Sequence, residues 1–165
     1  TLPDVETIFW LRANGCMLIA GPPKELNLLQ VRELNNKVFY SKTEGWYAED
    51  SQTFAKNDKV VAGQWLAIRK DEVPNSFSKT WKEQQDLITE DEYVPNAPTA
   101  SYAVTAYFKV RGIYLLRDNK YVRTNSVSAV DHRVRVGLFD EYGLRVYYGW
   151  DGSRYGTIGV SSARK

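Results

Sequence analysis

The chain has 165 residues, of which 43% are hydrophobic and 25% charged, a composition typical of a folded domain with a substantial core. The net charge of +2 gives no indication of a nucleic-acid or membrane partner, and no apolar run approaches the ~18 residues that a membrane span needs. One cysteine and one histidine exclude an internal disulfide and a Cys/His zinc finger. No signal-peptide pattern opens the sequence and no heptad repeat suggests assembly, so the default expectation is a cytoplasmic monomer.

The first hundred residues mix helical and strand-like patterns. Apolar spacing and capping residues predict helices, whereas short alternating runs predict strands. We expect helices over residues 3–11, from Pro23, and from the capping-box pair Thr80 and Glu83; strands at 37–41, 45–48 and 60–69; and an extended connection through Pro95 and Pro98.

From residue 100 the pattern is that of strands separated by Gly, Asp and Asn, with no helical period. The predicted strands are 102–110, 113–116, 121–127, 134–139, 144–150 and 158–162. The predicted fold class is therefore α+β, a single domain over residues 1–165 with N-terminal helices and an antiparallel β region.

Few residues could carry catalysis. His132 follows Asp131, and Ser126 and Ser128 lie nearby, but neighbours in sequence rarely face one another. No G-x-S-x-G turn and no glycine-rich phosphate loop is present. We therefore predict a protein that is not an enzyme and that has no cofactor and no metal site.

The C-terminal segment has a regular framework. From Val134 to Arg164 it reads V-x-V-G-x-F-D-x-x-G-L-x-V-x-x-x-W-D-x-x-R-x-x-x-I-G-V-S-S-A-R. The positions that this pattern gives by residue type include alternating aliphatic residues, turn glycines and a tryptophan, which are residue types that set a fold. We expect a core made of Val134, Val136, Phe139, Leu144, Val146 and Trp150.

This framework resembles the variable proteins of diversity-generating retroelements, of the kind carried by archaea and small-genome bacteria. The resemblance also includes residues 63–69, 73–76, 79–84 and 102–111, so it covers about residues 60–165. It implies a C-type lectin fold. It also implies that a reverse transcriptase copies a template repeat with errors at adenines, and that the copy replaces the 3′ end of the gene. The variable region is then about residues 125–164.

Adenine mutagenesis makes a compositional prediction. Randomised AAC-type Asn codons yield Tyr, Ser, Asp, His, Gly, Arg, Val, Ala, Leu or Thr, but never Lys, Glu, Gln, Met or Trp. Between residues 125 and 164 the only Lys, Glu, Gln or Met is Glu141, which we leave out of the site. The predicted variable, ligand-binding residues are Ala129, Val130, Asp131, His132, Arg135, Leu138, Tyr142, Arg145, Tyr147, Tyr148, Gly149, Gly152, Ser153, Tyr155, Gly156 and Thr157.

The function that the resemblance implies is ligand binding by a diversified surface. That surface is rich in Tyr and Arg, which are frequent in interface hot spots, so we expect a protein or glycoprotein ligand. A fixed-specificity lectin-like carbohydrate-binding module remains an alternative, although the Glu-Pro-Asn and Gln-Pro-Asp calcium motifs are missing. Single-stranded nucleic-acid binding by Tyr stacking is a further alternative, against which the balance of 22 Lys+Arg and 20 Asp+Glu argues.

Overall fold

The computed structural model describes all 165 residues and has the α+β class that the sequence predicts. The helices are α1 (Val5–Ala13), α2 (Leu28–Leu34), α3 (Phe54–Asn57), α4 (Trp81–Gln85) and α5 (Ala97–Arg111), with the 3-10 helices η1 (Asn36–Val38) and η2 (Trp46–Ala48). The strands are β1 (Cys16–Ala20), β2 (Leu26–Asn27), β3 (Lys59–Val60), β4 (Trp65–Arg69), β5 (Glu92–Tyr93), β6 (Tyr121–Val127), β7 (Arg133–Asp140), β8 (Gly143–Tyr148), β9 (Ile158–Val160) and β10 (Ala163–Arg164). None of the helices combines the length and apolar character that crossing a bilayer requires.

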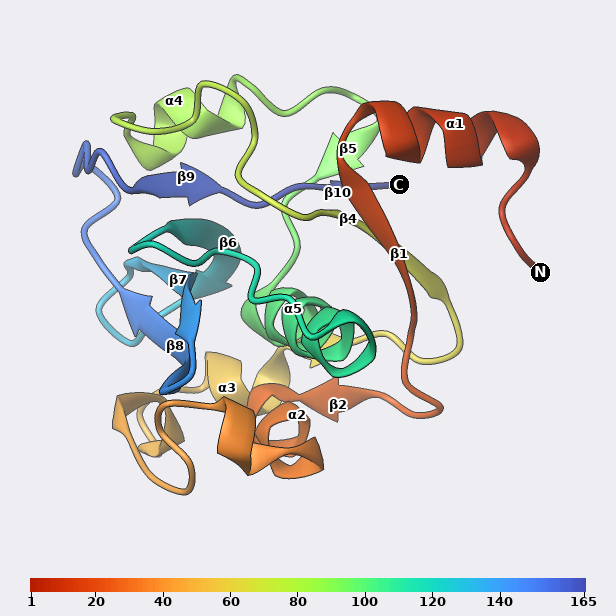
Figure 1. Cartoon of the computed structure of the whole chain (residues 1–165). Coiled ribbons are helices and arrows are strands. Elements are labelled where there is room, and N and C mark those ends of the chain that lie inside the picture. Colours follow the sequence, from red (N-terminus) through yellow and green to blue (C-terminus); the bar gives the residue numbers. More distant parts are fainter.

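Two four-stranded sheets and one two-stranded sheet organise the molecule. The strand orders are β1-β4-β10-β5, β8-β7-β6-β9 and β2-β3. Neighbouring strands are antiparallel except β6 and β9, so the predicted antiparallel region contains one parallel pair. Figure 1 shows α5 between the two larger sheets, with α4 above it and α2 and α3 below. Since β9 and β10 belong to different sheets, the C-terminal segment connects the two.

The largest departure from the sequence prediction is α5. Residues 102–110, predicted as a strand, lie in this helix, and the predicted extended connection includes its first turn. The Asn96 side chain caps the helix by accepting a hydrogen bond from the Thr99 N–H, and Pro98 lies where a missing N–H costs nothing. Tyr and β-branched residues gave the false strand signal, whereas the buried small residues have helical spacing. These are Ala97, Ala100, Ala103 and Val104.

Several shorter elements also differ from prediction. The second helix begins at Leu28 rather than Pro23, because Asn27 and Gln30 form a capping box there. Apolar runs this short do not distinguish a strand from a turn. Three further predicted strands are absent besides 102–110: residues 37–41 lie in and after η1, residues 45–48 contain η2, and residues 113–116 are irregular.

Other predicted elements are confirmed. Helix α1 overlaps the first predicted helix from Val5 to Leu11 and continues to Ala13. Thr80 and Glu83 form the expected capping box at the start of α4. The predicted strand 60–69 is present as β3 and β4, separated by a turn at Gly63 with φ 65°. Strands β6, β7, β8 and β9 lie where the alternating pattern predicts them.

The core prediction for the C-terminal segment is confirmed with one exception. The predicted residues with at most 5% exposed surface are Val134, Val136, Phe139, Leu144 and Val146. Trp150 is 64% exposed, so its prediction as a core residue is wrong. Strand β8 ends at Tyr148, and Trp150 follows in a loop where its ring lies against Gly152 instead of the core.

Candidate binding face

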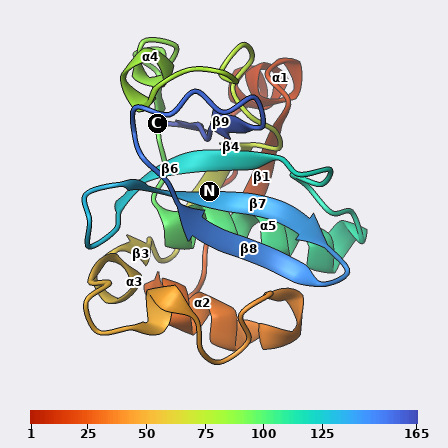
Figure 2. The same cartoon turned by 90° about the vertical axis from the view of Figure 1, so that its left-hand side faces the viewer.

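The β7–β8 hairpin separates the predicted variable side chains from the core. Its register pairs Arg135 with Tyr147 and Val136 with Val146. Because successive side chains of a strand point to opposite faces, the valines are buried while Arg135 and Tyr147 lie on the outer face. Figure 2 shows this hairpin in front of α5, so its outer face is turned towards the viewer.

None of the predicted variable residues is buried. Those classed as exposed are Ala129, Val130, Asp131, Tyr142, Tyr147, Tyr155, Gly156 and Thr157. Those of intermediate exposure are His132, Arg135, Leu138, Arg145, Tyr148, Gly149, Gly152 and Ser153. They form several local groups around the hairpin, each with its own contacts.

Arg135 is the centre of the first group. Its guanidinium carbon lies 4.9 Å from the ring centre of Tyr121, 5.4 Å from that of Tyr147 and 5.8 Å from that of Tyr155. A Cβ atom at Gly149 would lie 2.7 Å from Nη1 of Arg135, so the glycine leaves room for the guanidinium. Burial lowers the pKa of Arg135 from its ordinary value. We call Arg135, Tyr121, Tyr147 and Tyr155 the arginine–tyrosine cluster.

A row of aromatic rings continues from this cluster. Tyr147 and Tyr148 stack with their ring centres 5.5 Å apart, and the ring of Trp46 lies 4.8 Å from that of Tyr148. The His132 ring lies 6.1 Å from Tyr148. The Trp46 Nε1–H donates a hydrogen bond to the carbonyl oxygen of Val146, which fixes η2 against β8. Trp46 therefore supports the predicted site from a distant part of the chain.

Arg145 holds the β7–β8 turn rather than facing solvent freely. Its Nη1 donates to Asp140 Oδ1 and to the carbonyl oxygens of Leu138 and Gly143. Burial opposes ionisation of Asp140, but hydrogen bonds from the Tyr142 N–H and from Arg145 outweigh it, so the pKa of Asp140 lies below its ordinary value. Within this turn Tyr142 is 67% exposed and free for contact.

A buried arginine holds the loop after β8. The Arg123 guanidinium donates to the carbonyl oxygens of Trp150 and Ser153 in that loop. It also donates to the carbonyl oxygen of Lys79 and to Oε1 of Gln84, next to and within α4. Arg123 therefore fixes the loop that carries Tyr155 to α4.

The turn before β7 shows no catalytic arrangement. The Ser128 Oγ accepts from the backbone N–H of His132, and the Ser126 Oγ donates to Asp58. The Asp131 N–H donates to the Ser128 carbonyl oxygen, and no hydrogen bond joins the His132 ring to either serine. No group of three His, Cys, Asp or Glu side chains lies close enough together to hold a metal ion.

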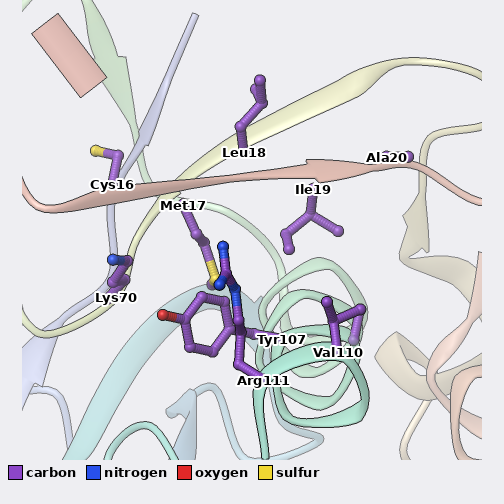
Figure 3. Close-up of a pocket in the computed structure, with 10 residues that line it drawn as sticks. Cys16, Met17, Leu18, Ile19, Ala20, Lys70, Tyr107, Val110 and Arg111 are labelled. Atoms are coloured by element: carbon purple, nitrogen blue, oxygen red, sulfur yellow. The ribbon is translucent and has the colours of Figure 1, made fainter. Parts of the chain in front are cut away.

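An apolar groove lies between β1 and α5, away from the hairpin. It has a volume of about 470 Å³, and Figure 3 shows Met17 and Ile19 pointing from β1 towards the helix that carries Tyr107 and Val110. None of the predicted variable residues lines it. The groove and the hairpin face are separate surfaces.

Sequence reasoning missed two members of the site. Tyr121 lies on β6 beside β7, and assuming that pairing would have placed its side chain next to Arg135. Trp46 is 100 residues from Val146, to which it hydrogen-bonds, and no local pattern indicates that contact. Comparison with known protein families, with curated proteins and with solved structures found no match.

Proposed function

We propose that this chain is a ligand-binding protein with a C-type lectin-like fold whose hairpin face is varied by retroelement-templated adenine mutagenesis. The observation that carries the proposal is that the sequence framework and the burial of side chains divide the same segment in the same way. The framework pattern separates fold residues from variable residues, and none of the predicted variable residues is buried. The aliphatic framework residues from Val134 to Val160 are buried, as a segment that combines a constant core with a changing surface requires.

The glycines support the same division. A Cβ atom at framework Gly137 would collide with the backbone of Lys120, and one at Gly143 with the backbone of Phe39. In contrast, a Cβ atom at the predicted variable Gly156 would meet nothing closer than 3.7 Å, the distance to Ser78 Oγ. A Cβ atom at the predicted variable Gly149 or Gly152 would lie 2.7 Å from the side chain of Arg135 or Trp150, respectively. Gly137 and Gly143 are therefore required by backbone packing, whereas replacement of Gly149 or Gly152 requires only a side-chain shift and Gly156 tolerates replacement.

The chemistry of the face suits recognition of a protein. Tyr147 and Tyr155 are each 50% exposed and Tyr142 is 67% exposed. Tyr gives a large contact area at a low cost in side-chain entropy, and Tyr, Trp and Arg are the residues most frequent in interface hot spots. The rings stand on a hairpin and on a loop fixed by Arg123, so the platform is ordered before it meets a ligand.

Deep sequencing of the 3′ end of this gene across its source population tests the proposal. We expect substitutions at the codons of the predicted variable residues, with the codons of Val134, Phe139 and Gly143 constant. The codons of residues 1–120 are the internal control and should be uniform. Uniform copies, or changes spread equally over both segments, would contradict the proposal and favour a fixed-specificity binding module.

A further inference from the structure

The arginine–tyrosine cluster contains a cation without a countercharge. The side chain of Arg135 makes no hydrogen bond and no ion pair within the chain, and its Nε is enclosed without an acceptor. Its contacts are the ring faces of Tyr121, Tyr147 and Tyr155. Ring faces attract a cation, but the N–H groups of a guanidinium also need acceptors. The cluster therefore presents hydrogen-bond donors that nothing in the chain uses.

Three other enclosed arginines have acceptors for their guanidinium groups, whereas Nε of Arg133 and Nη1 of Arg164 are, like Nε of Arg135, enclosed without one. Arg32 donates to three backbone carbonyl oxygens, and Arg123 donates to three carbonyl oxygens and to the side chain of Gln84. Arg145 has the carboxylate of Asp140 at 3.1 Å. Arg135 differs from Arg32, Arg123 and Arg145, since ring contacts alone explain its position. Arg164 also contacts only a ring, that of Trp10 at 4.4 Å, but it lies on β10, outside the hairpin face.

Positive charge is also in excess around Arg135. Arg123 is its cross-strand partner in the β6–β7 register, and Arg133 precedes it on the same face of β7. The carboxylate near these guanidinium groups is that of Asp151, which accepts a hydrogen bond from the Arg133 N–H and lies 4.0 Å from Arg133 Nη1. Like charges placed opposite each other destabilise a strand pair. An anion bound at Arg135 would offset this repulsion and stabilise the pairing of β6 with β7.

We infer that Arg135 binds a side-chain carboxylate, from Asp or Glu, of the protein that the face recognises; this inference rests on the proposed function. The planar fork of a guanidinium matches a carboxylate, and one such anion balances one unpaired cation. The surrounding rings exclude water and strengthen the contact. A phosphate carries more charge and is usually held by several cations, but the neighbouring Arg133 and Arg145 already have Asp151 and Asp140.

The experiment is a side-chain NMR titration of the intact chain. The Nε–H signal of Arg135 is assigned by its loss in Arg135→Gln and followed while N-acetyl-glutamic acid amide is added, whose one carboxylate is that of the side chain. We expect a saturable shift with a dissociation constant on the order of 10 mM, the weak affinity of a single small contact. N-acetyl-glutamine amide should produce no saturable shift, and inorganic phosphate a smaller response.

Matched variants distinguish carboxylate binding at Arg135 from non-specific effects of charge on the signals. Arg154→Gln removes an arginine that is 61% exposed and already paired with Glu83, so the Arg135 response should be retained. Arg135→Lys keeps the charge but loses the fork, and backbone signals near Tyr155 should then shift several-fold less on carboxylate addition. This variant also tests the site if Arg135→Gln does not fold.

Three results would overturn the inference: no saturable shift, equal responses to the glutamic and glutamine amides, or a stronger response to phosphate. The sequencing result for the proposed function is independent of this titration. If the gene is uniform but the carboxylate response is specific, the proposal of a diversified face is contradicted and the inference of a carboxylate site is supported. If the gene is varied but the Arg135 signal does not respond, the proposed function is supported and the carboxylate inference is contradicted.

Discussion

The two faces of the β7–β8 hairpin come from alternating residues of the same strands, yet they serve different purposes. The inward valines at 134, 136 and 146 are at most 5% exposed and belong to the main core. The outward Arg135 and Tyr147 contact one another and other surface residues. A period of two therefore lets a single hairpin carry a constant core and a changeable surface, because a substitution on one face leaves the packing of the other unaltered.

The outward side is itself divided. Arg123 and Arg145 make several hydrogen bonds that hold a loop and a turn, whereas Arg135 makes none. An outward position in a strand is thus free to vary only where its side chain is not also connecting two segments. Arg145 is one of the predicted variable residues, but it has a structural role because its side chain holds the β7–β8 turn.

The largest expected difference in the effect of a substitution on stability is between Phe139 in the core and Tyr142 on the surface. Phe139 is fully buried, with its ring centre 5.0 Å from that of Tyr114 and 5.3 Å from that of Phe108. We expect Phe139→Ala to lower the free energy of unfolding by about 3–5 kcal/mol, because it leaves a cavity. Tyr142→Ala should change it by less than about 0.5 kcal/mol. Urea denaturation measures both, and equal losses would contradict the division into two faces.

A smaller difference is expected between the cross-strand partners Arg123 and Arg135. Arg123→Gln should lower the free energy of unfolding by about 2–4 kcal/mol, since its loss leaves the carbonyl oxygens of a buried network without donors. Arg135→Gln should change stability by less than about 1 kcal/mol, because no hydrogen bond is lost. Thermal and urea unfolding of the two variants give the comparison. A greater loss for Arg135→Gln would make that arginine a structural residue.

The smallest difference is expected between Tyr147 and Tyr148. Tyr148→Ala removes a ring 4.8 Å from Trp46 and should lower the free energy of unfolding by about 1 kcal/mol. Tyr147→Ala, at a side chain that is 50% exposed, should lower it by less than about 0.5 kcal/mol. Both should weaken binding to a ligand selected on this face, measured by calorimetry. Unchanged affinity in both variants would place the binding surface elsewhere.

Local sequence patterns predict the hairpin well and the centre of the molecule poorly. In β7 and β8 the period of two and the turn glycines agree with burial, so the strands and most of their core residues follow from sequence. In α5 the same residue types predict the wrong element, because Pro98 is as compatible with an extended connection, which the sequence pattern predicts, as with the first turn of a helix. The size and apolar character of Trp150 predict a core residue, but its position depends on the end of β8 at Tyr148.

The site was predictable for residues whose own strand pattern places them outward. It was not predictable for residues brought in by long-range packing. Trp46 comes from η2, and Tyr121 joins the arginine–tyrosine cluster through strand pairing. The role of Arg145 depends on a turn conformation in which Leu138 has φ 43°, which no spacing in the sequence indicates.

The central claim is that positions 125–164 divide into residues that set the fold and residues that are free to vary. Saturation mutagenesis of this segment with a folding readout on a displayed protein tests it most directly. The account predicts tolerance at the predicted variable positions, with Arg145 as the exception, and intolerance at Val134, Gly137, Phe139, Gly143 and Leu144. Equal tolerance at both sets, or intolerance centred on Tyr142, Tyr147 and Tyr155, would contradict the account.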